Sequence, residues 1–134
     1  MLHRVDLTRW RDEGRARAAL ERVPCLIVLD TDQRPTAEFA DIVFPLATYV
    51  ESEGTFTNHA GRVQRFLAAV KPPGEARAGW LALGELLGDL SDEAPPASAG
   101  AVFAALAGAS APFAGLGYER LGLQGEIAGA APTP

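Results

Sequence analysis

One short polar stretch carries most of the side chains in this sequence that could do chemistry. ESEGTFTNHAGRVQ, residues 51–64, places two carboxylates, a histidine, an amide and an arginine between two apolar segments. Glu51 and Glu53 are two residues apart, so in an extended chain their side chains share one face and could divide acid and base roles. His59 could transfer protons near neutral pH. An active site is therefore one interpretation of this stretch.

Binding and a purely structural role are the two other interpretations. Gly54 and Gly61 can adopt positive φ and bring the backbone close to a ligand. Thr55 and Asn58 can donate and accept hydrogen bonds, and Arg62 could face a phosphate or a carboxylate. The glycines form no dinucleotide fingerprint, and the stretch has no Walker-type lysine. Because these residue types are also typical of turns, the residues alone favour the structural interpretation.

The composition limits the class of protein. The chain has 134 residues, 48% of them hydrophobic and 22% charged, which suits one globular domain with its own core. A net charge of −5 lacks the basic character of a nucleic-acid-binding domain. Cys25 is the single cysteine, which excludes a disulfide framework and a cysteine-ligated zinc or iron–sulfur site within this chain. The two histidines and their acidic neighbours are not spaced like a metal site.

The N-terminus bears arginines but no apolar signal-peptide core. No apolar run approaches the roughly 20 residues that a membrane helix needs. We therefore expect a cytoplasmic protein that reaches a membrane only through a complex.

The elements around the polar stretch predict an α/β fold. PCLIVLD, residues 24–30, and the apolar residues 42–44 are typical of buried parallel strands. Pro35 suits the first turn of a short helix between them. Pro45 cannot donate to a β-ladder, so pairing should end there. This strand–helix–strand pattern predicts a small parallel, Rossmann-like sheet with flanking helices.

Two longer helices are expected beside this sheet. Residues 7–23 follow a capping residue at Asp6. Residues 75–90 carry a tryptophan and several leucines on one face, with Glu75 in the first turn, where the helix dipole favours a negative charge.

Composition also predicts how the chain is divided. Residues 1–90 form the α/β portion, SDEAPPASAG at residues 91–100 is typical of a linker, and residues 101–134 form a helical and irregular C-terminal tail. A sheet of two or three strands is marginal by itself. We therefore expect the isolated chain to form a homodimer or to associate through an exposed sheet edge.

Residues 37–90 closely resemble a segment of the molybdopterin oxidoreductase superfamily. The shared pattern runs through ADIVFP, ESEGTFTN, GRVQ and PPGEA, then Trp80 and a leucine-rich helix. PFAGLGYERLGLQG, residues 112–125, also resembles the next segment of these proteins. The resemblance implies that the chain is part of a larger molybdopterin-oxidoreductase-like domain, and that it is a split subunit, a truncated paralogue or an expressed fragment.

The resemblance also implies that the polar stretch is the loop after a sheet strand, on the cofactor side of that domain. The implied cofactor-binding residues are Glu51, Glu53, Gly54, Thr55, Asn58 and Arg62. Ala60 departs from the pattern, which has a glutamate before the Gly-Arg pair, and this departure favours a scaffold role. The family carries its iron–sulfur clusters and molybdopterin guanine dinucleotide on other segments, so we expect no cofactor held by this chain itself.

Two branches of the superfamily compete. GRVQRF and AVKPPGEAR resemble more closely the large iron–sulfur subunit of bacterial NADH–quinone oxidoreductase, complex I. We therefore expect a non-redox structural portion of this electron-input subunit, not catalytic alone. It would support electron transfer from NADH to quinone and contact the other subunits or segments of the complex on the cytoplasmic side of the inner membrane. The alternative is a fragment of a molybdenum-dependent formate dehydrogenase or nitrate reductase-type enzyme that lines the molybdopterin cofactor.

Overall fold

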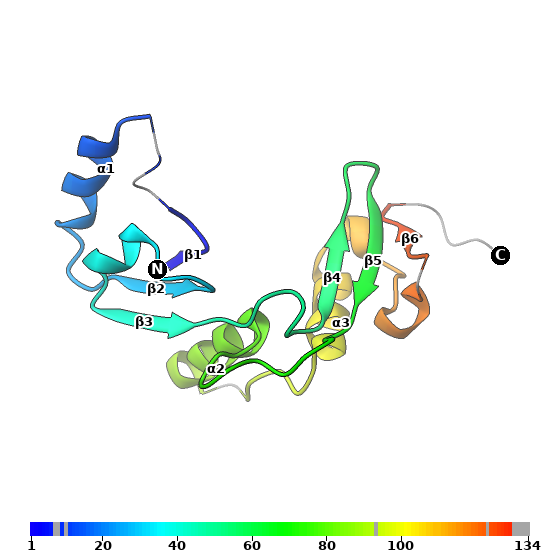
Figure 1. The fold of residues 1–134 in the computed structure, drawn as a ribbon. Coiled ribbons are helices and arrows are strands. Elements are labelled where there is room, and N and C mark those ends of the chain that lie inside the picture. The colour runs from blue at the N-terminus through cyan, green and yellow to red at the C-terminus, as the bar shows by residue number, and fades with distance from the viewer. Residues whose placement is uncertain (7–8, 10, 93, 123, 130–134) are drawn as a thin grey trace.

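Two small sheets organise the chain in this computed structural model, which describes residues 1–6, 9, 11–92, 94–122 and 124–129. A parallel sheet lies with helix α1 at one end of the molecule, and an antiparallel sheet lies with helix α3 at the other (Figure 1). The small parallel sheet and the α/β class that the sequence predicts are confirmed.

The parallel sheet has the order β1–β2–β3, with the most buried strand in the middle. Its strands are β1 (Leu2–His3), β2 (Ile27–Asp30) and β3 (Ile42–Pro45). Val28 of β2 pairs with Leu2 on one side and Val43 on the other. The 3-10 helix η2 (Pro35–Phe39) connects β2 to β3, and β3 ends at Pro45 as predicted.

Alternate residues of β2 pack on opposite faces of the sheet, as the pleat of a strand requires. Val28 packs with Leu20 of helix α1 (Glu13–Leu20). Leu29, fully buried, packs with Ala82 of helix α2 (Gly79–Ser91). The two helices therefore cover the two faces of the central strand.

Helix α1 is shorter than the predicted helix. Its cap is Asp12, whose side chain accepts a hydrogen bond from the backbone N–H of Arg15 at 3.0 Å. Asp6, the predicted cap, instead accepts a hydrogen bond from the hydroxyl of Thr36 at 3.3 Å. Residues 7, 8 and 10 of the predicted helix lie outside the described residues.

Helix α2 begins at Gly79, so the prediction that Glu75 lies in its first turn is wrong. The reason is that Arg77 pairs with the end of the parallel sheet. Its N–H donates to the carbonyl of Pro45 at 3.2 Å, and its carbonyl accepts from Ala47 at 2.7 Å. Extended backbone at Arg77 forms these bonds and cannot also continue a helix.

Part of the polar stretch is a β-hairpin rather than a loop. The antiparallel sheet consists of β4 (Gly54–Thr57), β5 (Arg62–Phe66) and β6 (Glu126–Ile127). Phe56 and Phe66 stack across β4 and β5 with ring centroids 4.5 Å apart. Such cross-strand aromatic pairs stabilise a hairpin, and the sequence analysis did not use this pair.

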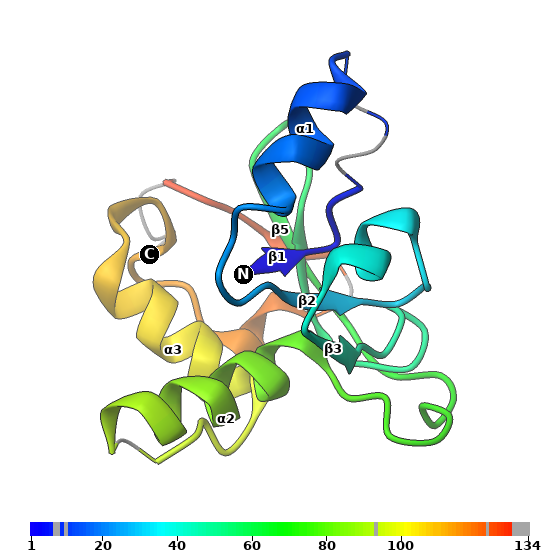
Figure 2. The same cartoon turned by 90° about the vertical axis from the view of Figure 1, so that its left-hand side faces the viewer.

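The C-terminal part packs on β5. It comprises α3 (Ala99–Ala109), η3 (Ala111–Phe113) and η4 (Tyr118–Leu121). Val63 of β5 shares a core with Phe103, Tyr118 and Leu121. Figure 2 shows α3 beside α2, and no helix in the described part of the chain is long and apolar enough to span a bilayer. The division at residues 90 and 100 stays a prediction.

Candidate functional site

A cavity of about 340 Å³ lies between the two sheets. His3 and Arg4 reach it from the carboxyl end of β1, while Tyr49 and Ser52 reach it from the loop after β3. Ligands of open parallel sheets bind outside the carboxyl ends of the strands. The cavity is therefore the candidate ligand site. Its remaining wall comes from Glu53, which directly precedes β4, and from β4, β5, α2, α3 and η4, with Thr55, Phe56, Phe66, Trp80, Phe103 and Tyr118.

Glu53 is the point at which three segments meet in the cavity wall. The hydroxyl of Tyr118 donates to Oε2 of Glu53 at 3.2 Å. The indole Nε1 of Trp80 donates to the backbone carbonyl of the same residue, also at 3.2 Å. Helix α2 and the C-terminal segment thus hold the half-buried Glu53 from two directions.

Tyr118 keeps its proton far into the alkaline range. Burial, followed by the charge of Glu53 and the hydrogen bond to it, raises the pKa of Tyr118 from 10.0 to about 12. The positive charge of Arg65 opposes this shift, since its guanidinium lies 5.0 Å from the Tyr118 ring centre. Arg65 also pairs with Glu119. The phenol is therefore a hydrogen-bond donor to Glu53 at any physiological pH.

Three of the six residues predicted to bind a cofactor line this cavity, namely Glu53, Gly54 and Thr55. Gly54 is closely packed, because a Cβ there would lie 3.1 Å from the ring of Phe66. This contact is tight enough that a side chain at residue 54 would displace the Phe66 ring.

The other three predicted residues make backbone contacts elsewhere. Glu51 accepts the N–H of Thr48 at 2.8 Å within the turn after β3. Asn58 accepts the N–H groups of Ala60 and Arg62, both at 3.0 Å, and so closes the β4–β5 turn. Arg62 donates from Nη1 to the carbonyls of Gln124 and Gly125 at 3.2 and 3.3 Å. Cofactor binding by the six residues stays a prediction.

His59, considered for acid–base chemistry, is exposed at the tip of the hairpin. Asn58 and Arg62 lie at the two ends of that same turn, and neither borders the cavity. The crowding of polar groups in the sequence therefore comes largely from the needs of a tight turn.

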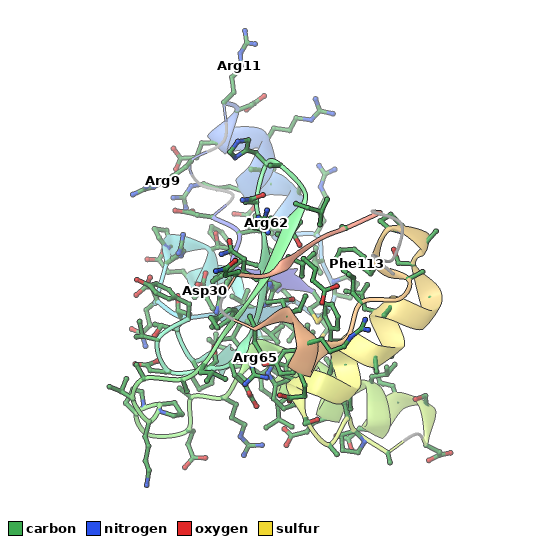
Figure 3. The ribbon with its side chains drawn as sticks, turned by 90° about the vertical axis from the view of Figure 1, so that its right-hand side faces the viewer. Arg9, Arg11, Asp30, Arg62, Arg65 and Phe113 are labelled. Carbon is green, nitrogen blue, oxygen red and sulfur yellow. The ribbon has the colours of Figure 1, made fainter. Side chains whose placement is uncertain are left out.

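A second polar group follows the strand ends of the parallel sheet. Asp30 is the last residue of β2 and is 4% exposed (Figure 3). Its Oδ1 accepts the N–H of Thr31 at 2.7 Å. Its Oδ2 lies 3.0 Å from Nε of Arg34, yet neither atom makes a hydrogen bond because the N–H is not directed at the oxygen. The pair is thus held by charge alone.

Oγ1 of Thr48 is likewise buried without a hydrogen bond among the described residues. Buried polar atoms without partners are rare in folded proteins, and each calls for an explanation. The sequence analysis missed Asp30 and Thr48. An acidic residue at the carboxyl end of a buried parallel strand was the signal that could have pointed to Asp30.

The described part of the chain contains no candidate metal site. Nowhere in it do three or more histidine, cysteine, aspartate or glutamate side chains lie close enough together to hold a metal ion. The polar residues of the cavity are instead dispersed around an aromatic wall. This arrangement suits an organic ring with a few polar atoms.

The sequence of this chain matches a known protein family and several known proteins. The model of the molybdopterin oxidoreductase family matches residues 1–89. The F420-dependent formate dehydrogenase 2 subunit alpha of Methanococcus maripaludis is 35% identical over 116 residues, covering 85% of this chain and 17% of that protein. The formate dehydrogenase 1 subunit alpha of the same organism is 39% identical over 116 residues, covering 80% and 16%.

A relative named for a different activity is similar to the same degree. The NADPH-Fe(3+) oxidoreductase subunit alpha of Geobacter sulfurreducens is 40% identical over 103 residues, covering 77% of this chain and 12% of that protein. The chain thus spans between 12% and 17% of the length of these three curated relatives.

Proposed function

We propose a function on the premise that this chain belongs to the molybdopterin oxidoreductase family, whose model matches residues 1–89. The chain lines the molybdopterin cofactor of a larger oxidoreductase of the formate dehydrogenase type. The observation that carries this proposal is the cavity at the carboxyl end of the parallel sheet, with Glu53 held in its wall. Other segments or subunits complete the site and supply the redox centres.

The cavity residues fit a flat heterocycle that carries N–H donors. Trp80 and Tyr118 offer aromatic surface on which such a ring can pack. The carboxylate of Glu53 can accept charge-assisted hydrogen bonds from ring N–H groups. Arg4 donates from Nη2 to the carbonyl of Ala47 at 2.9 Å, and a guanidinium has further N–H groups to offer an anionic oxygen.

We extend the proposal to the nucleotide half of the same cofactor, for which the candidates are two buried polar atoms near the carboxyl ends of β2 and β3, on residues that do not line the cavity. Oδ2 of Asp30 is an acceptor, and Oγ1 of Thr48 can donate or accept. Hydroxyl and amino groups of a nucleotide are the complementary partners. A ligand that bonds these atoms offsets the cost of burying them.

A bound molybdopterin group supplies the redox chemistry of the assembly. The residues of this chain bind and orient that group. Glu53 accepts from the ring, and the aromatic wall excludes water from it. The hydrogen bond from Trp80 holds the backbone of Glu53 and the hydrogen bond from Tyr118 holds its carboxylate before a ligand arrives, which lowers the cost of ordering the site on binding.

The names of the relatives support the formate dehydrogenase alternative more than the complex I assignment that the sequence analysis put first. The complex I role remains the second candidate, because GRVQRF and AVKPPGEAR resemble that branch more closely. In either case we propose a cytoplasmic location and association with other subunits or segments of the oxidoreductase.

The test is to isolate the native assembly that contains this chain and to measure its molybdenum and pterin content. The formate dehydrogenase proposal expects both in stoichiometric amount. An assembly that contains subunits of NADH–quinone oxidoreductase but neither molybdenum nor pterin would overturn it in favour of the complex I scaffold.

Two matched variants then test the site itself. Glu53→Gln should weaken retention of the pterin roughly 10-fold or more, since it removes the charge of an acceptor. Glu38→Gln makes the same change at an exposed residue outside the cavity, and should retain the pterin. Equal retention in both variants would show that Glu53 does not contact the cofactor.

A further inference from the structure

We propose that Tyr118 is a positioning residue of the cavity, through which the C-terminal segment from Ala99 to Leu121 completes the ligand site. This segment lies beyond residues 1–89, to which the family model matches. The identity of the ligand rests on the proposed function, but the contacts that carry this inference do not.

Two hydrogen bonds hold Glu53, and they act on different parts of the residue. Trp80 fixes its backbone, since the indole bonds the main-chain carbonyl. Tyr118 fixes its side chain, since the phenol bonds Oε2 of the carboxylate. A glutamate side chain has three rotatable bonds, so the backbone contact alone leaves the carboxylate free to rotate. Tyr118 is therefore the group that decides where the carboxylate lies.

Tyr118 can fix the position of the carboxylate because its own ring is held by core packing. Tyr118 is 8% exposed and packs in the core with Val63, Phe103 and Leu121. The rings of Tyr118 and Phe103 lie 6.1 Å apart. Helix α3 lies against this ring, since a Cβ at Gly100 would be in van der Waals contact with it, at 3.4 Å. Core packing of the C-terminal segment thus sets the direction of the hydroxyl.

Arg65 adds a second constraint on the same ring. Its guanidinium lies 5.0 Å from the ring centre and pairs with Glu119, the next residue along η4. The ring is consequently held between α3 and β5. In this arrangement Oε2 of Glu53 accepts the hydrogen bond from the Tyr118 hydroxyl, and the other carboxylate oxygen is left to accept a hydrogen bond from a ligand.

The contact can be measured directly because the chain has two tyrosines, Tyr49 and Tyr118. In a Tyr49→Phe background, phenolate absorbance reports Tyr118 alone, which should titrate at a pKa of about 12. Glu53→Gln should lower this pKa, because it removes the charge and weakens the hydrogen bond. Glu51→Gln, the same change outside the cavity, should leave the pKa of Tyr118 unchanged. An unchanged pKa in Glu53→Gln, or an equal fall in Glu51→Gln, would overturn the contact.

The positioning role is tested in the native assembly with Tyr118→Phe, which keeps the ring and removes the hydroxyl. We expect about a 5- to 10-fold loss of pterin retention, the effect of one hydrogen bond. The control is Phe113→Leu, which disturbs the same core next to Phe103 but removes no polar group. It should lower the melting temperature while pterin retention at low temperature stays at the wild-type level.

The outcomes separate this inference from the proposed function. A wild-type assembly without pterin defeats the proposed function, while the titration still decides whether Tyr118 holds Glu53. Equal pterin retention in the wild-type assembly and in Tyr118→Phe defeats the positioning role alone. Equal losses in Tyr118→Phe and Phe113→Leu also defeat it, because they would indicate a general effect of core stability.

Discussion

Gly84 of helix α2 packs directly against Pro96, so closely that a Cβ added at Gly84 would lie 2.3 Å from Cδ of Pro96. Pro96 belongs to residues 91–100, which composition marks as a linker. The contact holds this connection against the helix that covers the parallel sheet. It also accounts for a glycine inside a helix, where glycine costs about 1 kcal/mol relative to alanine.

We predict that Gly84→Ala destabilises the protein by about 1–3 kcal/mol, the usual cost of overpacking a closed contact. Gly108→Ala in helix α3 is the matched control, because nothing lies within 4 Å of the added Cβ. That variant should gain up to about 1 kcal/mol of helix propensity. Urea unfolding of the two variants measures both effects, and a gain in stability for Gly84→Ala would rule out the close contact.

The β4–β5 turn should depend on Asn58. Asn58→Ala leaves the N–H groups of Ala60 and Arg62 without their shared acceptor, and both lie in an exposed turn that water can reach. We expect a loss of about 1 kcal/mol, read from the denaturation midpoint. His59→Ala at the neighbouring exposed position is the control and should change stability by less than about 0.5 kcal/mol. Similar losses in both variants would contradict the role assigned to Asn58.

Stability should fall at alkaline pH through Tyr118. Its pKa is raised in the folded protein, so the folded state holds the phenolic proton more tightly than the unfolded state. The resulting stabilisation is fully present below the unfolded value of 10.0 and is lost as the pH rises toward about 12. Tyr118→Phe does not titrate and should lose less stability across this window.

Unfolding free energies of the wild-type protein and Tyr118→Phe, measured from about pH 8 upward, check this prediction. Their difference should be constant below the unfolded pKa of 10.0 and change only above it. A constant difference across the whole range would mean that Tyr118 ionises alike in the folded and unfolded states.

The edge of the parallel sheet should associate in the isolated chain. The N–H of Leu46 donates to the carbonyl of Asp30 in β2, and the N–H of Ile42 donates to the carbonyl of Leu26 just before β2. Because successive N–H groups of a strand point to opposite sides, the N–H of Val43 points to the open edge of the sheet. Ile42 and Val43 are each 45% exposed, which leaves apolar surface on both faces of β3. Pro45 limits the free donors at this edge.

We expect concentration-dependent dimers of the isolated chain in sedimentation velocity. Val43→Lys should shift the population to monomers, because a charged residue on an edge strand opposes pairing. Leu67→Lys replaces an exposed leucine away from that edge and should leave association intact. A monodisperse wild-type monomer with a sharp thermal transition would refute the prediction.

Strands β2 and β3 of the parallel sheet were within reach of sequence reasoning because their signals are local, whereas the two-residue strand β1 carries no such signal and was not predicted. The apolar run before Asp30 and the second run ending at Pro45 each identify a strand without reference to the rest of the chain. Their parallel pairing follows from the short helical connection between them. The motif pattern around Glu53 and Trp80 likewise pointed to the family, since it is read from consecutive residues.

Helix starts were less predictable, because two kinds of hydrogen bond compete there. Glu75 suits a helix N-terminus by charge, yet Arg77 bonds Pro45 and Ala47 across the sheet edge and delays the helix to Gly79. Asp6 and Asp12 are equally good caps by residue type. Packing of α1 on the sheet through Leu20 is compatible with the shorter helix, and no local rule selects between them.

The sequence by itself determined two of the three strands of the parallel sheet, β2 and β3, the family and the segment in which the polar residues gather. Only the tertiary structure decided which of those residues share a site. Asn58 and Arg62 serve a turn and a strand contact, while Glu53 meets Tyr118 from 65 residues away. The physical reason is that strand and turn propensities act between near neighbours, whereas a cavity forms where distant segments bury their apolar faces together.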